Sequence, residues 1–138
     1  MANDDKRLVL RDLFAGIIPE EWGKFIPLHP GVEILQLYGP DSSEMGTLAE
    51  QSSGSDQSSG SDQSSAALIR YSPGSTVPEH RHHGYEHIVI LSGSQSDDRG
   101  TYERGACIVN PPGTSHSVSS REGCLVLAIW NRPVEVLN

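Results

Sequence analysis

The stretch Gly74–Gly93 reads GSTVPEHRHHGYEHIVILSG and places two histidines and a glutamate at short, regular intervals. His80 and His82 are two residues apart, so on a strand both imidazoles lie on one face, because successive side chains alternate between faces. Gly84 permits a tight turn, and Glu86 then opens a second predicted strand. The pattern predicts a β-hairpin that brings His80, His82 and Glu86 into one cluster.

The same alternation separates these residues from the neighbouring histidines. Ile88 and Ile90 share the predicted face of Glu86, whereas His87 takes the opposite face. His83 falls in the turn. We therefore expect His83 and His87 to lie outside the cluster.

A fourth residue of the cluster must come from another part of the chain. His116 follows the turn Pro111–Gly113 and is the best candidate. Three imidazoles and one carboxylate suit Fe, Mn, Ni, Co or Zn, whereas Ca and Mg prefer oxygen ligands. We predict one divalent transition metal per chain, bound by His80, His82, Glu86 and His116. Four protein ligands leave two open positions on an octahedral ion and none on tetrahedral zinc.

Strand signals dominate the rest of the chain. Short runs of β-branched, aromatic and leucine residues alternate with Gly-, Pro- and Asp-containing turns, one of which is predicted at Ser92-Gly93. A single helical turn is expected at Pro19–Lys24. This spacing predicts an all-β sandwich or barrel. The predicted strands are Val32–Tyr38, Ala66–Tyr71, Glu86–Leu91, Gly105–Asn110, Ser115–Ser119 and Cys124–Trp130.

Residues 51–65 read QSSGSDQSSGSDQSS, repeat the hexamer SSGSDQ and contain no apolar side chain. Such a segment buries too little surface to offset its ordering entropy, so we expect a mobile loop between two strands. The remaining organisation is predicted as an N-terminal extension over 1–31 and one domain over 32–138.

Length and charge exclude several classes of protein. The chain has 138 residues, with 18 acidic and 10 basic side chains, giving a net charge of −8. This balance argues against nucleic acid as a partner, because phosphate-binding surfaces need clustered Lys and Arg. The longest apolar run, Cys124–Trp130, is far shorter than the roughly 18 residues of a membrane-spanning helix. The start shows no signal-peptide pattern, and two cysteines make no disulfide framework, so we expect a cytoplasmic protein without a membrane partner.

The histidine-containing stretches resemble the two motifs of the cupin superfamily. The first motif, G-x5-H-x-H-x3,4-E-x6-G, is matched at Gly74, His80, His82, Glu86 and Gly93. The second, G-x5-P-x-G-x2-H-x3-N, is matched at Gly105, Pro111, Gly113 and His116, and then has Ser120 in place of Asn. The resemblance implies a double-stranded β-helix, the jelly-roll barrel of cupins, for most of the chain.

Five further short sequence segments are similar to those of the ChrR-like group of cupins. That group includes the C-terminal domain of zinc-containing anti-sigma factors and free-standing cupins, some of them dioxygenases acting on small ketones. The chain departs from the group at Gly84–His87, where two glycines and two glutamates are usual. The five similar segments are Tyr71–Gly74, Val77–His80, Tyr102–Gly105, Asn110–Gly113 and Glu122–Cys124.

Two functions remain open. The first is a metal-dependent oxidoreductase, dioxygenase-like, acting on a small carbonyl or phenolic compound. The second is a non-catalytic zinc-binding sensor or binding module related to the C-terminal domain of ChrR-type anti-sigma factors. Residues 1–31 contain one histidine and no cysteine, so we expect no complete anti-sigma factor with a zinc-binding N-terminal domain. Because cupins commonly pair through edge strands, we expect a homodimer that binds a small-molecule ligand or substrate.

Several side chains outside the cluster are assigned provisional roles. Arg70 and Tyr85 are candidate substrate contacts, with an outward-facing Arg70 as the alternative. Tyr102 and Trp130 are further candidates for a pocket wall. Cys107 and Cys124 are predicted to be buried thiols, residues 97–99 a solvated turn, and His29 a loop residue.

Overall fold

The computed structural model describes residues 7–39 and 63–137, and strands dominate this part of the chain. Two single 3₁₀ turns precede the strands, η1 (Leu13–Ala15) and η2 (Glu20–Trp22), the second inside the predicted helical turn. The strands are β1 (Ile26–His29), β2 (Val32–Tyr38), β3 (Ser65–Tyr71), β4 (Ser75–Arg81), β5 (Glu86–Asp97), β6 (Gly100–Glu103), β7 (Cys107–Asn110), β8 (Ser115–Ser120), β9 (Cys124–Trp130) and β10 (Glu135–Val136).

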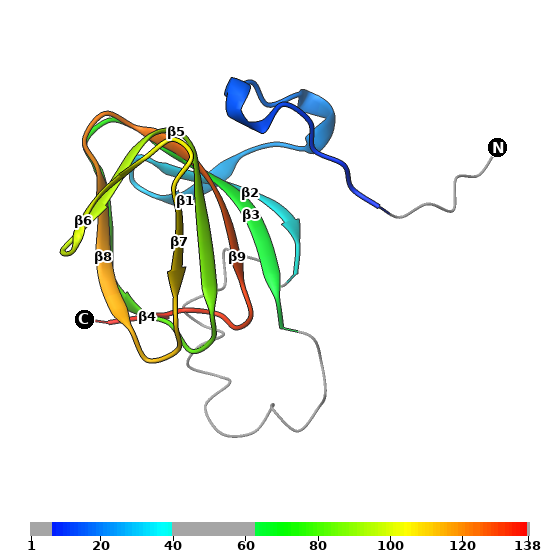
Figure 1. Cartoon of the computed structure of the whole chain (residues 1–138). Coiled ribbons are helices and arrows are strands. Elements are labelled where there is room, and N and C mark those ends of the chain that lie inside the picture. The colour runs from blue at the N-terminus through cyan, green and yellow to red at the C-terminus, as the bar shows by residue number, and fades with distance from the viewer. Residues whose placement is uncertain (1–6, 40–62, 138) are drawn as a thin grey trace.

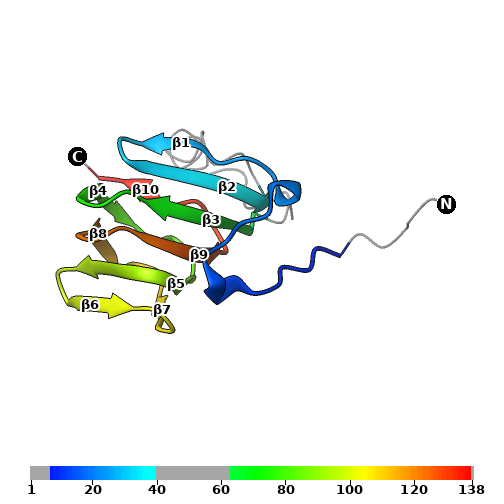
Figure 2. The same ribbon diagram turned by 90° about the horizontal axis from the view of Figure 1, so that it is seen from above.

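The strands form one curled antiparallel sheet in the order β1-β2-β3-β9-β5-β8-β4-β10, with β6 and β7 also paired to β5 (Figure 1). The long strand β5 belongs to two layers. Its first half pairs with β9 and β7, and its second half pairs with β6 and β8. The layer of β2, β3 and β9 faces the layer of β4, β8 and β10 (Figure 2). The predicted all-β barrel is confirmed.

The layer of β2, β3 and β9, called the first layer below, carries apolar side chains on both faces. The inner face closes the barrel, and the outer face is covered by the N-terminal segment. Ile34 points into the barrel interior, whereas its neighbour Leu35 belongs to a second apolar cluster on the outer face. Trp22 and Phe25 pack against that outer cluster, and β1 pairs with β2. The predicted N-terminal extension, from residue 7 on, therefore packs against the barrel.

The predicted turn at Ser92-Gly93 is wrong, because β5 runs through it. The pairing register with β9 shifts between Ile90 and Ser92, and Gly93 has a φ of 72°. A register shift next to a left-handed residue is typical of a β-bulge, which bends a strand. The bend lets one strand pass from the first layer to the second.

The predicted hairpin between the strands of His80 and Glu86 is also wrong. β4 pairs with β8 and β10, and β5 begins in the opposite layer beside β9 and β7. The connection from 82 to 85 therefore crosses between layers. Side-chain alternation is the same in both arrangements, so the sequence pattern alone does not distinguish them.

The low-complexity loop predicted at 51–65 lies outside the described residues except for its last three, and Ser65 already begins β3. Within the described ranges, no helix has the length and apolar character needed to cross a membrane.

Candidate metal centre

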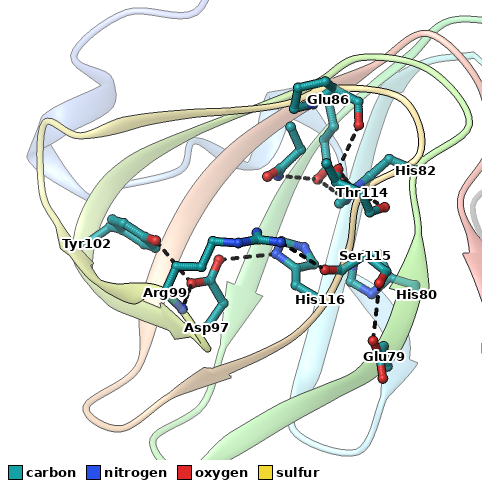
Figure 3. Close-up of polar contacts among 12 residues, drawn as sticks. Glu79, His80, His82, Glu86, Asp97, Arg99, Tyr102, Thr114, Ser115 and His116 are labelled. Carbon is teal, nitrogen blue, oxygen red and sulfur yellow. Dashed lines mark hydrogen bonds and ion pairs between the residues drawn. The ribbon is translucent and has the colours of Figure 1, made fainter.

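Three histidines and one glutamate converge between the two layers of the barrel (Figure 3). His80 on β4 lies opposite His116 on β8 in the strand register, and His82 follows directly after β4. Glu86, the first residue of β5, reaches them from the other layer. All four side chains are buried, and their possible ligand atoms lie within 4.8 Å of one another. The structure thus brings together the four residues that the spacing selected.

The three imidazole rings are oriented by oxygen atoms behind them. Nδ1 of His80 lies 2.9 Å from the Pro78 carbonyl, and Nδ1 of His116 lies 3.2 Å from Oδ2 of Asp97. Nδ1 of His82 lies 2.9 Å from Oγ1 of Thr114, a hydroxyl that itself donates to a carbonyl and so accepts from the ring. Since each Nδ1 must donate its proton to an acceptor, the lone pair of each ring lies on Nε2.

Two of the three opposite nitrogens have no such partner. Nε2 of His82 and Nε2 of His116 are buried without a hydrogen bond to any residue in the described ranges. Nε2 of His82 lies 2.8 Å from Oε1 of Glu86, a separation at which their two lone pairs repel unless a proton or a cation lies between them. An unsatisfied buried polar atom costs about 1–3 kcal/mol, and a cation shared by these atoms would remove that cost. The residues present therefore fit a bound divalent metal.

Electrostatics favour the protonation states that bind a metal. Burial raises the pKa of Glu86, but the contact with His82 and the nearby His80 and His116 outweigh it, so that the net pKa is lowered. Asn110 supports the carboxylate by donating to Oε1 over 3.1 Å. Burial also lowers the pKa of His80, which keeps this imidazole neutral. A carboxylate and a neutral imidazole are the forms that coordinate a metal.

Asp97 supports the site, which the sequence reading missed. The expectation that residues 97–99 form only a solvated turn is wrong, because the Asp97 side chain is 5% exposed and contacts His116. The Arg99 backbone N–H and the Tyr102 hydroxyl donate to Oδ1 of Asp97 over 2.9 and 3.0 Å (Figure 3). Burial raises the pKa of Asp97, but these two donors and His116 lower it by a larger amount. The net pKa is therefore below its usual value, and the carboxyl group stays ionised. Only the pairing of β5 with β8 reveals this contact.

Replacing Asp97 with alanine is expected to weaken metal binding by about 10–100-fold, because partners that orient a ligating imidazole contribute that much to affinity. Competition against a chromophoric chelator measures the effect. The matched control is Asp98→Ala, which removes an exposed carboxylate of the same turn. Equal affinities of the two variants would contradict the role given to Asp97.

A cavity of about 250 Å³ adjoins the cluster. His80, Glu86 and His116 form part of its wall, and most of the other lining residues are apolar. Trp130 is among them, as predicted, and His29 reaches the cavity from the end of β1 instead of lying in a loop. The volume is below the roughly 300 Å³ at which pockets for drug-sized ligands begin, so the cavity suits a small molecule.

The model of the ChrR cupin-like domain family matches residues 57–134, which is more than half of the chain. The chain belongs to the ChrR cupin-like family. No curated protein matches it in sequence. One similar structure is the Rhodobacter sphaeroides SigE in complex with the anti-sigma ChrR, with a TM-score of 0.58 and 20% identity over 80% of this chain and 49% of that one. The chain thus spans about half the length of the ChrR-complex chain it matches.

Two further similar structures match a larger share of this chain. A putative acetylacetone dioxygenase from Methylibium petroleiphilum has a TM-score of 0.67, and an acetylacetone dioxygenase from Acinetobacter johnsonii has a TM-score of 0.64. Both are 13% identical to this chain, and each match covers 100% of it and 85% of the other chain. These likenesses establish the cupin fold.

Within this ChrR cupin-like domain, the candidate substrate contacts lie away from the cavity. Arg70 is on the outer face of β3, where it pairs with Glu33 at 2.7 Å and lies over the Phe25 ring. Tyr85 is 48% exposed and is absent from the cavity wall. Tyr102 binds Asp97 instead of lining the cavity. The alternative kept for Arg70, an outward-facing residue, agrees with this placement.

The remaining histidines and cysteines of the ChrR cupin-like domain also have defined positions. His83 is exposed and contacts Glu135, and His87 is exposed on the outer side of β5, so both lie outside the cluster. Cys124 is buried, as predicted, and burial raises its pKa to about 11. The prediction for Cys107 is wrong, since this thiol is exposed where the short strand β7 ends the sheet beside β5.

Proposed function

We propose that this ChrR cupin-like protein binds one divalent transition metal through His80, His82, Glu86 and His116. We further propose that it acts as a dioxygenase-like oxidoreductase on a small carbonyl or phenolic compound. The observation that carries the proposal is the apolar cavity whose wall includes His80, Glu86 and His116. A site of purely structural importance does not require such a space beside its ligands.

The residues of the site would have three roles: supplying negative charge, orienting the ligating imidazoles and excluding water. A metal held there would act as a Lewis acid toward a chelating oxygen ligand and toward dioxygen. Glu86 supplies one negative charge, and Asp97 and Thr114 fix two of the imidazoles. The apolar wall, which includes Ile88 and Trp130, keeps water from the reacting groups.

The acetylacetone dioxygenases among the similar structures suggest the first compounds to examine, because their names specify a small 1,3-diketone. Such a molecule is compact and mostly apolar and carries two oxygens that chelate one ion. These properties agree with the volume and lining of the cavity.

The second candidate is a zinc-binding sensor or binding module. The family match and the similarity to the anti-sigma ChrR in its complex with SigE favour it. In that case the four side chains would close a tetrahedral site, and the barrel would bind an effector or a protein partner. For either function we propose a homodimer formed through edge strands, for which β1 with its half-exposed Ile26 is a candidate.

Metal analysis of the protein purified without added ions, followed by oxygen uptake with 1,3-diketones and hydroxyaryl ketones, tests the proposed function. We expect one equivalent of iron, manganese or nickel and oxygen consumption that depends on the added compound. The protein after chelation serves as the control and should consume no oxygen. Stoichiometric zinc without oxygen consumption would overturn the enzyme and favour the sensor.

A further inference from the structure

A buried amide lies on the wall of the mostly apolar cavity. Gln95, on the second half of β5, is 3% exposed and lines the cavity. Its Nε2 makes no hydrogen bond of suitable distance and direction to any residue that the structure describes, although the Tyr71 phenol lies close enough to interact with the amide. An orphan donor of this kind costs about 1–3 kcal/mol, which is unusual in a barrel interior that could accommodate Leu or Met at the same position.

A second polar group accompanies this amide. The Tyr71 hydroxyl belongs to a buried residue of the same cavity wall, and the Gln95 side chain lies close enough to oppose the rise in its pKa that burial causes. The phenol stays protonated. The two side chains thus form a polar pair in a wall of aliphatic residues such as Val118 and Val126.

The strand geometry places Gln95 within one small molecule's length of the metal ligands. Gln95 and Asp97 are two residues apart on one face of β5, which separates their Cα atoms by about 7 Å. Asp97 contacts His116 directly. A ligand bound at the metal centre and extended by a few carbon atoms along the cavity would therefore come within reach of the Gln95 amide.

The charge of the lining narrows the chemistry of that ligand. None of the described residues in the cavity wall is a lysine or an arginine, and burial lowers the pKa of His29, which disfavours its cationic form. The cavity therefore has no permanent cation to balance an anionic group. The Nε2 atom of Gln95 is a neutral donor, and its complement is a neutral acceptor oxygen such as a carbonyl.

We propose that Gln95 is a specificity-determining residue that donates a hydrogen bond to a neutral carbonyl-type oxygen of the ligand, remote from the metal-binding end. The ligand would then be a small, uncharged and mostly apolar compound with a chelating oxygen pair at one end and an acceptor oxygen several carbons away. This inference rests on the proposed function, because the chelating end is assigned to the metal centre.

The test compares octane-2,4-dione with octane-2,4,7-trione, which carries an additional carbonyl at the far end of the chain. Affinities are measured by titration calorimetry on metal-loaded wild type and Gln95→Leu, under nitrogen so that no turnover occurs. The wild type is expected to prefer the trione, and the ratio of the two dissociation constants is expected to change by about 2–10-fold in Gln95→Leu, the effect of one neutral hydrogen bond. Gln36→Leu, on β2, is the matched control and should keep the wild-type ratio.

A ratio that is the same in wild type and Gln95→Leu would overturn the proposal, as would the absence of binding of both compounds to the wild type. A second measurement covers the case in which the variant folds poorly. Because an unsatisfied donor is removed, ligand-free Gln95→Leu is expected to melt at or above the wild-type temperature, and a large decrease would assign Gln95 a structural role instead. Failure of the proposed function is distinguishable from failure of this inference. In that case oxygen uptake would be absent, but the ratio of the two dissociation constants would still differ between wild type and Gln95→Leu.

Discussion

Replacing His82 with alanine is expected to abolish stable metal binding. The substitution removes one of four ligands at a position that is 1% exposed, where neither water nor another described side chain takes over easily. The affinity should fall by more than the roughly 100-fold that loss of an orienting partner can cost. Metal content after dialysis, measured by mass spectrometry, should fall from one equivalent to a small fraction.

His83→Ala is the matched control for this experiment. It changes the next residue along the chain, which has the same chemistry but is exposed and contacts Glu135 instead of the cluster. Since a ligand that binds only the native state raises its stability, added metal should raise the melting temperature of wild type and His83→Ala but not of His82→Ala. Unchanged metal content in His82→Ala would contradict the assignment.

Replacing Gly93 with alanine is expected to cost more than about 3 kcal/mol of the free energy of unfolding. Gly93 has a φ of 72°, and a Cβ built on it would overlap the backbone oxygen of Gly123. Alanine in the left-handed region costs about 1–2 kcal/mol by itself, and a clash with backbone adds to this because neither strand can yield independently. Urea unfolding followed by circular dichroism measures the loss.

Gly74→Ala separates the two contributions. Gly74 also has a positive φ, of 84°, but no atom lies within 4 Å of the place where its Cβ would stand. This variant should lose only the conformational part, about 1–2 kcal/mol. Equal losses at the two positions would show that the close approach of β5 to Gly123 has no energetic weight.

The clustering of the four candidate ligands was predictable because it depends mainly on local geometry. The i, i+2 spacing of His80 and His82 holds wherever that segment is extended, and the alternation along β5 separates Glu86 from His87 in any sheet. For the same reason the six predicted strands all correspond to strands of the structure. His116 is distant in the sequence, and it was identified by its place after a turn and by its match to the second cupin motif.

The features that the sequence did not predict depend on which strands are neighbours. Asp97 looks like one acid of a polar turn until β8 is placed beside β5. Gly93 looks like a turn glycine because a bulge and a turn both need a positive φ, and only the pairing with β9 distinguishes them. Arg70 lies two residues from Leu68 on a sheet whose outer face is covered by the N-terminal segment, and that covering could not be foreseen from an irregular sequence.

The central claim is that four side chains bind one metal ion through the Nε2 atoms of three histidines and the carboxylate of Glu86. Anomalous diffraction from crystals of the metal-loaded protein, recorded at the absorption edge of the metal found by elemental analysis, tests it most directly. We predict a single strong peak per chain at about 2.0–2.2 Å from Nε2 of His80, His82 and His116 and from an oxygen of Glu86. A peak at the exposed His83 or His87, or no peak within coordination distance of His116, would contradict the account.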